Sequence, residues 1–127
     1  MSLYSARADL ADALQTSTGF TTHEDVPDRL EPPCLAIEAS DNYVSPGSTF
    51  DPDDIAVRLD VIALVPIGGD STQSRRDLDG LLKQVLKHLP EDWTFIGSGK
   101  PGPLTNGEWL AYGVPLTVES TTSNEGA

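Results

Sequence analysis

The sequence predicts an α+β fold, with an antiparallel or mixed β-sheet of about four to five strands and two helices packed on one face. Three observations carry this prediction. Residues 55–65 alternate apolar side chains with other residues, which is the two-residue period of a half-buried strand. Residues 3–14 and 78–89 instead place Leu, Val and Ala three and four positions apart, which is the period of a helix with one buried face.

The first helix is expected over 3–14, with Ser2 as a candidate N-cap and Gly19 as the left-handed residue that follows its last turn. A short strand is expected at 20–23 and another at 34–39. The loop between these two strands contains prolines, which exclude both a helix and a central strand there.

Residues 40–54 are expected to form an exposed loop, because Pro46, Gly47 and Pro52 interrupt any regular structure. The strand at 55–65 follows and ends at Pro66. We expect it to pair with the strand at 34–39 across this loop as a long-looped hairpin.

The second helix is expected to begin after Asp70, whose spacing to Gln73 resembles a capping box, and to end near His88. A third apolar strand is expected at 93–96.

A flexible or extended loop over 97–103 and a final strand over 108–119 complete the predicted domain, with a candidate bulge near 113–115. The chain is therefore interpreted as one domain over residues 1–119. Residues 120–127 are polar and are expected to be a disordered C-terminal tail.

The net charge of −12 on 127 residues argues against a basic face for nucleic-acid binding. Acidity that serves solubility alone remains an alternative explanation. The charge is uneven: residues 1–60 hold twelve Asp or Glu, whereas residues 75–100 hold five of the eight Lys and Arg. Such a chain could pair head to tail with copies of itself, a contact that generates rings when the rotation closes. The basic residues could equally be the solvated face of a helix.

No motif in the sequence predicts catalysis, so the chain is not expected to be an enzyme or to hold a cofactor or metal. Lys100 follows Gly-Ser-Gly as in a phosphate-binding loop, but Thr94 and Pro101 stand where that motif needs Gly and Ser or Thr. His23 and His88 lack the spacing of zinc ligands. The acidic segment 51–54 leaves weak cation binding open, although Ile62 stands where an EF-hand needs Glu.

Cys34 is the only cysteine, which excludes a disulfide within the chain and fits a reducing compartment. It is expected to be buried rather than reactive. The N-terminus has no signal-peptide pattern, and no apolar run is long enough to span a membrane. The protein is therefore expected to be soluble, intracellular when made, and not bound to a membrane.

The order of elements resembles the tail terminator proteins of long-tailed bacteriophages, especially those that infect actinobacteria. The resemblance runs through residues 1–119 and is one of layout and character. Its carriers are the helix Leu3–Leu14, the segment Pro32–Ile37, the segment Asp41–Val44, the strand Ala56–Val65 and the helix Asp77–Leu86.

This resemblance implies a structural virion protein, assembled in the host cytoplasm and located at the head–tail junction. Tail terminators form a ring, which the resemblance implies is hexameric, on the last ring of tail tube protein. The ring stops tube polymerisation and joins the tail to the head-tail connector protein, and DNA passes through its lumen without specific binding. An acidic lumen would avoid the electrostatic attraction between Lys or Arg side chains and the phosphates of DNA.

The resemblance carries no catalytic residues, and candidate lumen or interface residues follow from loop position and charge. The candidate lumen or interface residues are Asp51, Asp53, Asp54, Arg75, Arg76, Lys100 and Trp109, of which the three aspartates are the choice for the lumen. A neck or head-completion protein at the head–tail connector remains an alternative within the same class. A small acidic protein that binds a host factor is the alternative from a different class.

Overall fold

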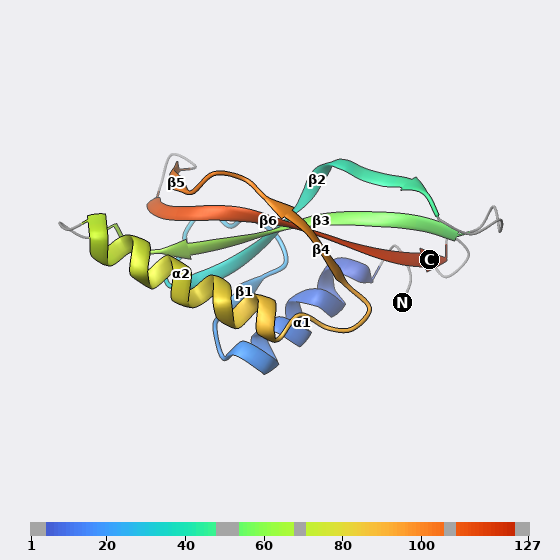
Figure 1. The fold of residues 1–127 in the computed structure, drawn as a ribbon, viewed down its shortest axis with the longest axis horizontal. Helices are drawn as coiled ribbons and strands as arrows, with labels where there is room; N and C mark the ends of the chain where they lie inside the picture. The colour runs from blue at the N-terminus through green and yellow to red at the C-terminus, as the bar shows by residue number, and fades with distance from the viewer. Residues whose placement is uncertain (1–4, 48–53, 68–70, 106–108, 124–127) are drawn as a thin grey trace.

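The structure, a computed structural model, describes residues 5–47, 54–67, 71–105 and 109–123 of the chain. Two helices cover one face of a six-stranded mixed sheet, which confirms the predicted α+β fold with slightly more strands than expected (Figure 1). The helices are α1 (Ala6–Thr18) and α2 (Ser71–Lys87). The strands are β1 (Thr22–His23), β2 (Cys34–Pro46), β3 (Asp54–Val65), β4 (Thr94–Ser98), β5 (Gly102–Thr105) and β6 (Leu110–Ser123).

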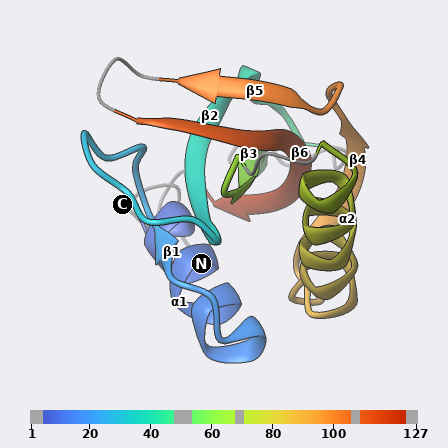
Figure 2. The ribbon, with the colours of Figure 1, turned by 90° about the vertical axis from the view of Figure 1, so that its left-hand side faces the viewer.

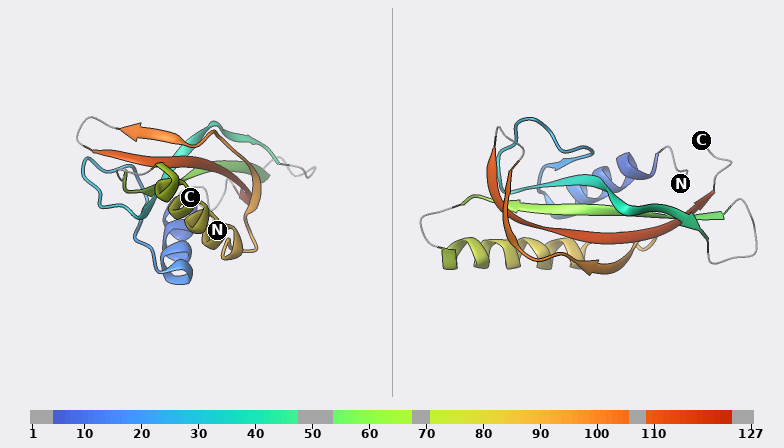
Figure 3. Two further views of the ribbon diagram at one scale, coloured as in Figure 1. Left: turned by 60° about the vertical axis from the view of Figure 1, so that its left-hand side comes forward. Right: turned by 90° about the horizontal axis from the view of Figure 1, so that it is seen from above.

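The sheet has the order β1-β2-β3-β6-β4, and β5 also pairs with β6. Strand β1 runs parallel to β2, and every other pairing is antiparallel. The pairing of β2 with β3 confirms the predicted pairing of these strands, although the connection between them is shorter than the predicted long loop. On its other side β6 pairs first with β5, over residues 110–113, and then with β4, over residues 116–119. Strands β4 and β5 therefore form the same edge of the sheet (Figure 3).

The main core lies between the sheet and the two helices. The alternating residues of β3 predicted to face the core are buried from Val57 to Val65, and Ile55 packs against them. Leu10 and Leu14 of α1 and a leucine–valine stripe of α2 complete this layer. Burying one such side chain stabilises the fold by roughly 1.5–3 kcal/mol, so these residues fix the position of both helices.

The ends of the helices largely agree with the sequence. Gly19 follows α1 with φ of 79°, which confirms the predicted left-handed residue. Helix α1 begins at Ala6 with Ser5 as its N-cap, so the predicted start at residue 3 with Ser2 as N-cap is wrong. Ser2 itself lies outside the described residues. Asp70 also lies outside them, and the Gln73 side chain donates a hydrogen bond to Asp77, with 2.7 Å from Nε2 to Oδ1.

The predicted loop over 40–54 is wrong for residues 40–46, which continue β2. Ala39 pairs with Leu59, and the next residue of β2 that pairs with β3 is Val44, which lies opposite Val57. Strand β2 therefore has extra residues between these two pairs, and they form a bulge. This bulge turns polar residues outward, so the segment lacks the apolar alternation by which a strand is recognised in a sequence. Residues 48–53 lie outside the described part of the chain.

Two further expectations need correction at the other edge. The predicted loop over 97–103 is wrong at both ends, because β4 extends to Ser98 and β5 begins at Gly102, whereas residues 99–101 lie between the two strands. The predicted bulge near 113–115 is absent from the β3–β6 ladder, which is continuous there, and the irregularity falls in β4 between Phe95 and Gly97.

The disordered tail predicted from Ser120 is also wrong at its start. Strand β6 continues to Ser123, Ser120 is buried, and it pairs with Val57. The backbone ladder with β3 accounts for this extension, since such pairing needs no apolar side chain. Residues 124–127 lie outside the described part of the chain.

Candidate interaction surfaces

The helix-free face of the sheet carries a small apolar cluster at one end. Cys34, Leu64 and Ala111 are buried there beneath the loop that joins β1 to β2. The Trp109 indole Nε1 donates a hydrogen bond to the carbonyl oxygen of Pro27 in that loop, at 3.1 Å. The candidate contact residue Trp109 is thus half-buried and fixes the loop onto the sheet.

Polar side chains occupy the same face farther along the strands. Arg58 of β3 lies opposite Glu119 of β6, and its Nε is 3.3 Å from Glu119 Oε2. At the next cross-strand pair on the same face, the Thr117 hydroxyl donates a hydrogen bond to Asp60 Oδ1 at 2.7 Å. Glu38 of β2 stands opposite Asp60 on the other side, so a carboxylate pair faces solvent here. The two-residue period of β3 puts Arg58 and Asp60 on one face of the sheet, but their partners are not visible in the sequence because they depend on the register with β6.

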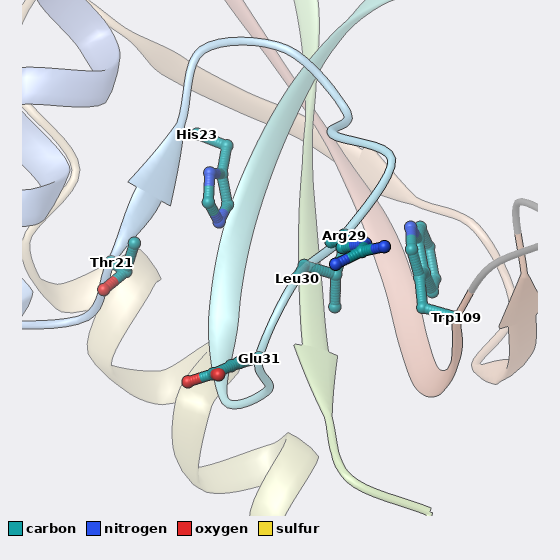
Figure 4. Close-up of a pocket in the computed structure, with 6 residues that line it drawn as sticks. All are labelled: Thr21, His23, Arg29, Leu30, Glu31 and Trp109. Carbon is teal, nitrogen blue, oxygen red and sulfur yellow. The ribbon is translucent and has the colours of Figure 1, made fainter.

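An open pocket of about 850 Å³ lies between β1 and the loop that follows it (Figure 4). Its lining comprises Thr21, His23, Arg29, Leu30, Glu31 and Trp109. Arg29 lies beside the indole ring of Trp109, whereas Glu31 lies away from both. A lining with both signs of charge, spread over an open surface, does not indicate one class of ligand.

Strand β4 forms an exposed edge of the sheet. It has β6 on one side and no partner strand on the other among the described residues. Phe95 and Ile96 of this strand are 42% and 47% exposed. The register shift between Phe95 and Gly97 breaks the regular ladder, and such irregularities protect an edge against unspecific pairing.

The sequence-predicted site residues do not form one site. Asp54 begins β3 opposite Ser123, at the end of the sheet far from the start of α2 (Figure 1). Arg75 and Arg76 are exposed near the start of α2, and Lys100 is exposed between β4 and β5. The other two lumen candidates, Asp51 and Asp53, lie outside the described residues.

Cys34 is fully buried, as expected, and burial raises the pKa of its thiol to about 11. Within the described ranges, no group of three or more His, Cys, Asp or Glu side chains could hold a metal ion. No helix in the part of the chain that the structure describes has the length and apolar character needed to cross a membrane. A scan against models of known protein families finds no match to this chain, and no curated protein matches it.

Proposed function

We propose that this protein is a tail terminator, a structural virion subunit that forms a ring at the head-proximal end of a phage tail. The observation that carries the proposal is the exposed β4 edge with its two apolar side chains, Phe95 and Ile96, which suits a subunit that contacts copies of itself. The identification as a tail terminator, rather than another assembly protein, rests on the resemblance in the order of elements.

The proposed mechanism is assembly alone. One face of the ring caps the last ring of tail tube protein and stops its polymerisation, while the other face receives the head-tail connector protein. DNA passes through the lumen. A subunit with net charge −12 supports this role, because phosphates are repelled by carboxylates rather than held by Lys and Arg.

The first experiment measures the native mass of the purified protein and images it by negative stain, alone and mixed with its tail tube protein. A hexameric ring, or a cap at one end of the tube, is the expected result. A protein that leaves the tube uncapped but binds the connector would be a neck protein instead. A monomer that binds neither component would favour the host-factor alternative.

A matched pair of variants tests the β4 edge. Ile96→Lys places a charge on this edge, whereas Ile67→Lys places the same charge on a side chain of similar exposure, 44%, just after β3. Ile96→Lys is expected to remain folded and lose the ring, while Ile67→Lys retains it. Loss of the ring in both variants, or in neither, would contradict a role for the edge.

A further inference from the structure

The solvent side of α2 carries a row of basic side chains. Arg76, Lys83 and Lys87, here called the basic row, are all exposed. At 3.6 residues per turn they fall within about 40° of one another around the helix and span roughly 16 Å along it. The buried residues Leu78 and Val85 lie on the opposite side of α2. The basic row is therefore the outermost ridge of the helix, with no role in holding α2 to the sheet.

Four exposed carboxylates, Asp77, Asp79, Glu91 and Asp92, lie on α2 and the turn after it, beside the basic row. A larger group of six lies on α1 and on the loop after β1. They are Asp9, Asp12, Glu24, Asp25, Asp28 and Glu31, here called the acidic edge. Arg7 and Arg29 are the cations among them, and Arg7 forms an ion pair with Asp25. An excess of four negative charges remains on this part of the surface.

The two charged surfaces lie on opposite sides of the subunit. Helix α1 packs against β1 and β2 at one edge of the sheet, whereas α2 packs over β3 and β6 toward the β4 edge. Figure 2 shows α1, β1 and the following loop on one side of the molecule, and α2 with β4 on the other. Complementary surfaces on opposite sides meet when copies follow one another head to tail, and such heterologous contacts generate rings or filaments.

We propose that the basic row of one copy docks on the acidic edge of the next copy. This inference rests on the proposed assembly of copies and adds which surfaces meet. The net charge of −12 opposes association, but the Debye length is about 8 Å at physiological ionic strength. Charges spread over the rest of two subunits are therefore largely screened from each other. Facing charges at the contact, which are closer than this and partly desolvated, keep their attraction.

Gly80 supports a close approach at this ridge. It lies beside the basic row in the helix interior, where glycine destabilises a helix by about 0.5–1 kcal/mol relative to alanine. A Cβ added at Gly80 would meet no atom within 4 Å, so the packing of this chain does not require glycine there. A neighbouring copy that approaches the helix backbone closely would require it.

Charge reversal on each surface tests the contact. One variant carries Arg76→Glu, Lys83→Glu and Lys87→Glu, and the other carries Glu24→Lys, Asp28→Lys and Glu31→Lys. In each variant the basic-row surface and the acidic-edge surface carry net charge of the same sign and repel each other between copies. Each variant alone is therefore expected to associate only at protein concentrations at least tenfold higher than the wild type requires. An equimolar mixture restores opposite signs at every contact. Native mass spectrometry of the mixture should show complexes with equal numbers of the two variants.

Matched single variants control for net charge. Arg75→Glu and Arg76→Glu change the charge equally at adjacent exposed positions. Arg75, which the sequence alone also suggested as a contact residue, lies about 100° away around the helix and outside the basic row, so this inference gives it no part in the contact. Arg76→Glu is expected to weaken association and Arg75→Glu to leave it unchanged. Circular dichroism of each variant verifies that it is folded.

Several results would overturn the inference. They are association that persists in both triple variants, a mixture that stays dissociated, and a wild type that is monomeric at every concentration. A duplex of about 20 base pairs that binds the wild type, but not the variant without the basic row, would assign that row to nucleic acid instead. Capping of the tube is measured separately, so the proposed function can stand when this contact fails.

Discussion

At the scale of single residues, Cys34 shows how burial sets chemistry. Its side chain is fully buried against Leu64 and Ala111, and the loss of hydration disfavours the thiolate. The pKa of the thiol rises from 9.0 to about 11. At neutral pH the group is therefore a protonated apolar side chain and not a nucleophile.

The raised pKa of Cys34 predicts a loss of stability at high pH. The unfolded chain releases the thiol proton near pH 9, whereas the folded chain retains it until about pH 11. The folded state therefore binds more protons in this window, and the free energy of unfolding falls as the pH rises, by at most about 3 kcal/mol. The contribution is complete below pH 9.

Urea unfolding across this pH window checks the prediction, with Cys34→Ala as the control. Other groups titrate in the same range, so the difference between the two proteins isolates the thiol. The wild type should lose stability more steeply than Cys34→Ala. Parallel pH profiles would contradict the raised pKa, as would rapid labelling of the folded protein by a thiol reagent at pH 8.

The side-chain pairs on the helix-free face of the sheet show which residue contacts the sequence alone cannot predict. Arg58 and Asp60 could be assigned to one face from the period of their strand alone. Their partners Glu119 and Thr117 depend on how β6 aligns with β3. Register is fixed by contacts distant in sequence, so neither the pairs nor a site built from them could be predicted.

At the scale of elements, Gly19 and Gly80 both have room for a Cβ, yet replacing them by alanine is predicted to change stability in opposite directions. A Cβ added at Gly80 or at Gly19 would meet no atom within 4 Å. Gly80 lies inside α2, so Gly80→Ala should stabilise the protein by about 0.5–1 kcal/mol. Gly19 has φ of 79°, so Gly19→Ala should destabilise it by about 1–2 kcal/mol.

Chemical denaturation of the two variants, at concentrations where the protein is monomeric, measures both changes. Because available space is the same at the two positions, the opposite signs test the backbone argument alone. A destabilising Gly80→Ala would mean that α2 needs glycine for its own fold. The explanation of Gly80 by a neighbouring copy would then fail.

The elements predicted correctly are those with one face in the core. Strand β3 and both helices show their period in the sequence because apolar side chains must recur wherever the element meets the core. The second half of β2 and strand β5 escaped prediction for the opposite reason. They lie at bulged or edge positions, where polar residues, Gly and Pro are tolerated.

At the scale of the whole molecule, the positions of the charged residues matter more for association between copies than the net charge does. The acidic edge and the basic row lie toward opposite edges of the sheet, which allows attraction between copies despite a net charge of −12. The uneven distribution along the sequence already suggested head-to-tail contact. The fold adds that β1 and β4 are opposite edges, so the two surfaces cannot neutralise each other within one subunit.

Within one subunit, the same net charge predicts that salt stabilises the fold. Twelve excess negative charges repel one another more in the folded state than in the expanded chain, and salt screens this repulsion. Salt also weakens ion pairs such as the exposed Arg7–Asp25 pair and the half-buried Arg58–Glu119 pair, but ion pairs at the protein surface contribute only about 0–1 kcal/mol each. The repulsion is the larger effect, so the urea midpoint of the monomer should rise between about 10 mM and 200 mM NaCl.

A variant with part of the acidic edge neutralised controls this experiment. Glu24→Gln, Asp28→Asn and Glu31→Gln remove three negative charges from exposed positions of one loop. This variant should have a higher urea midpoint than the wild type at low salt and a smaller response to NaCl, because less repulsion remains to be screened. A wild-type midpoint that falls as salt is added would show that ion pairs outweigh the net repulsion. The acidic edge would then be held by its partners within the subunit, and less of its charge would remain to attract a neighbouring copy.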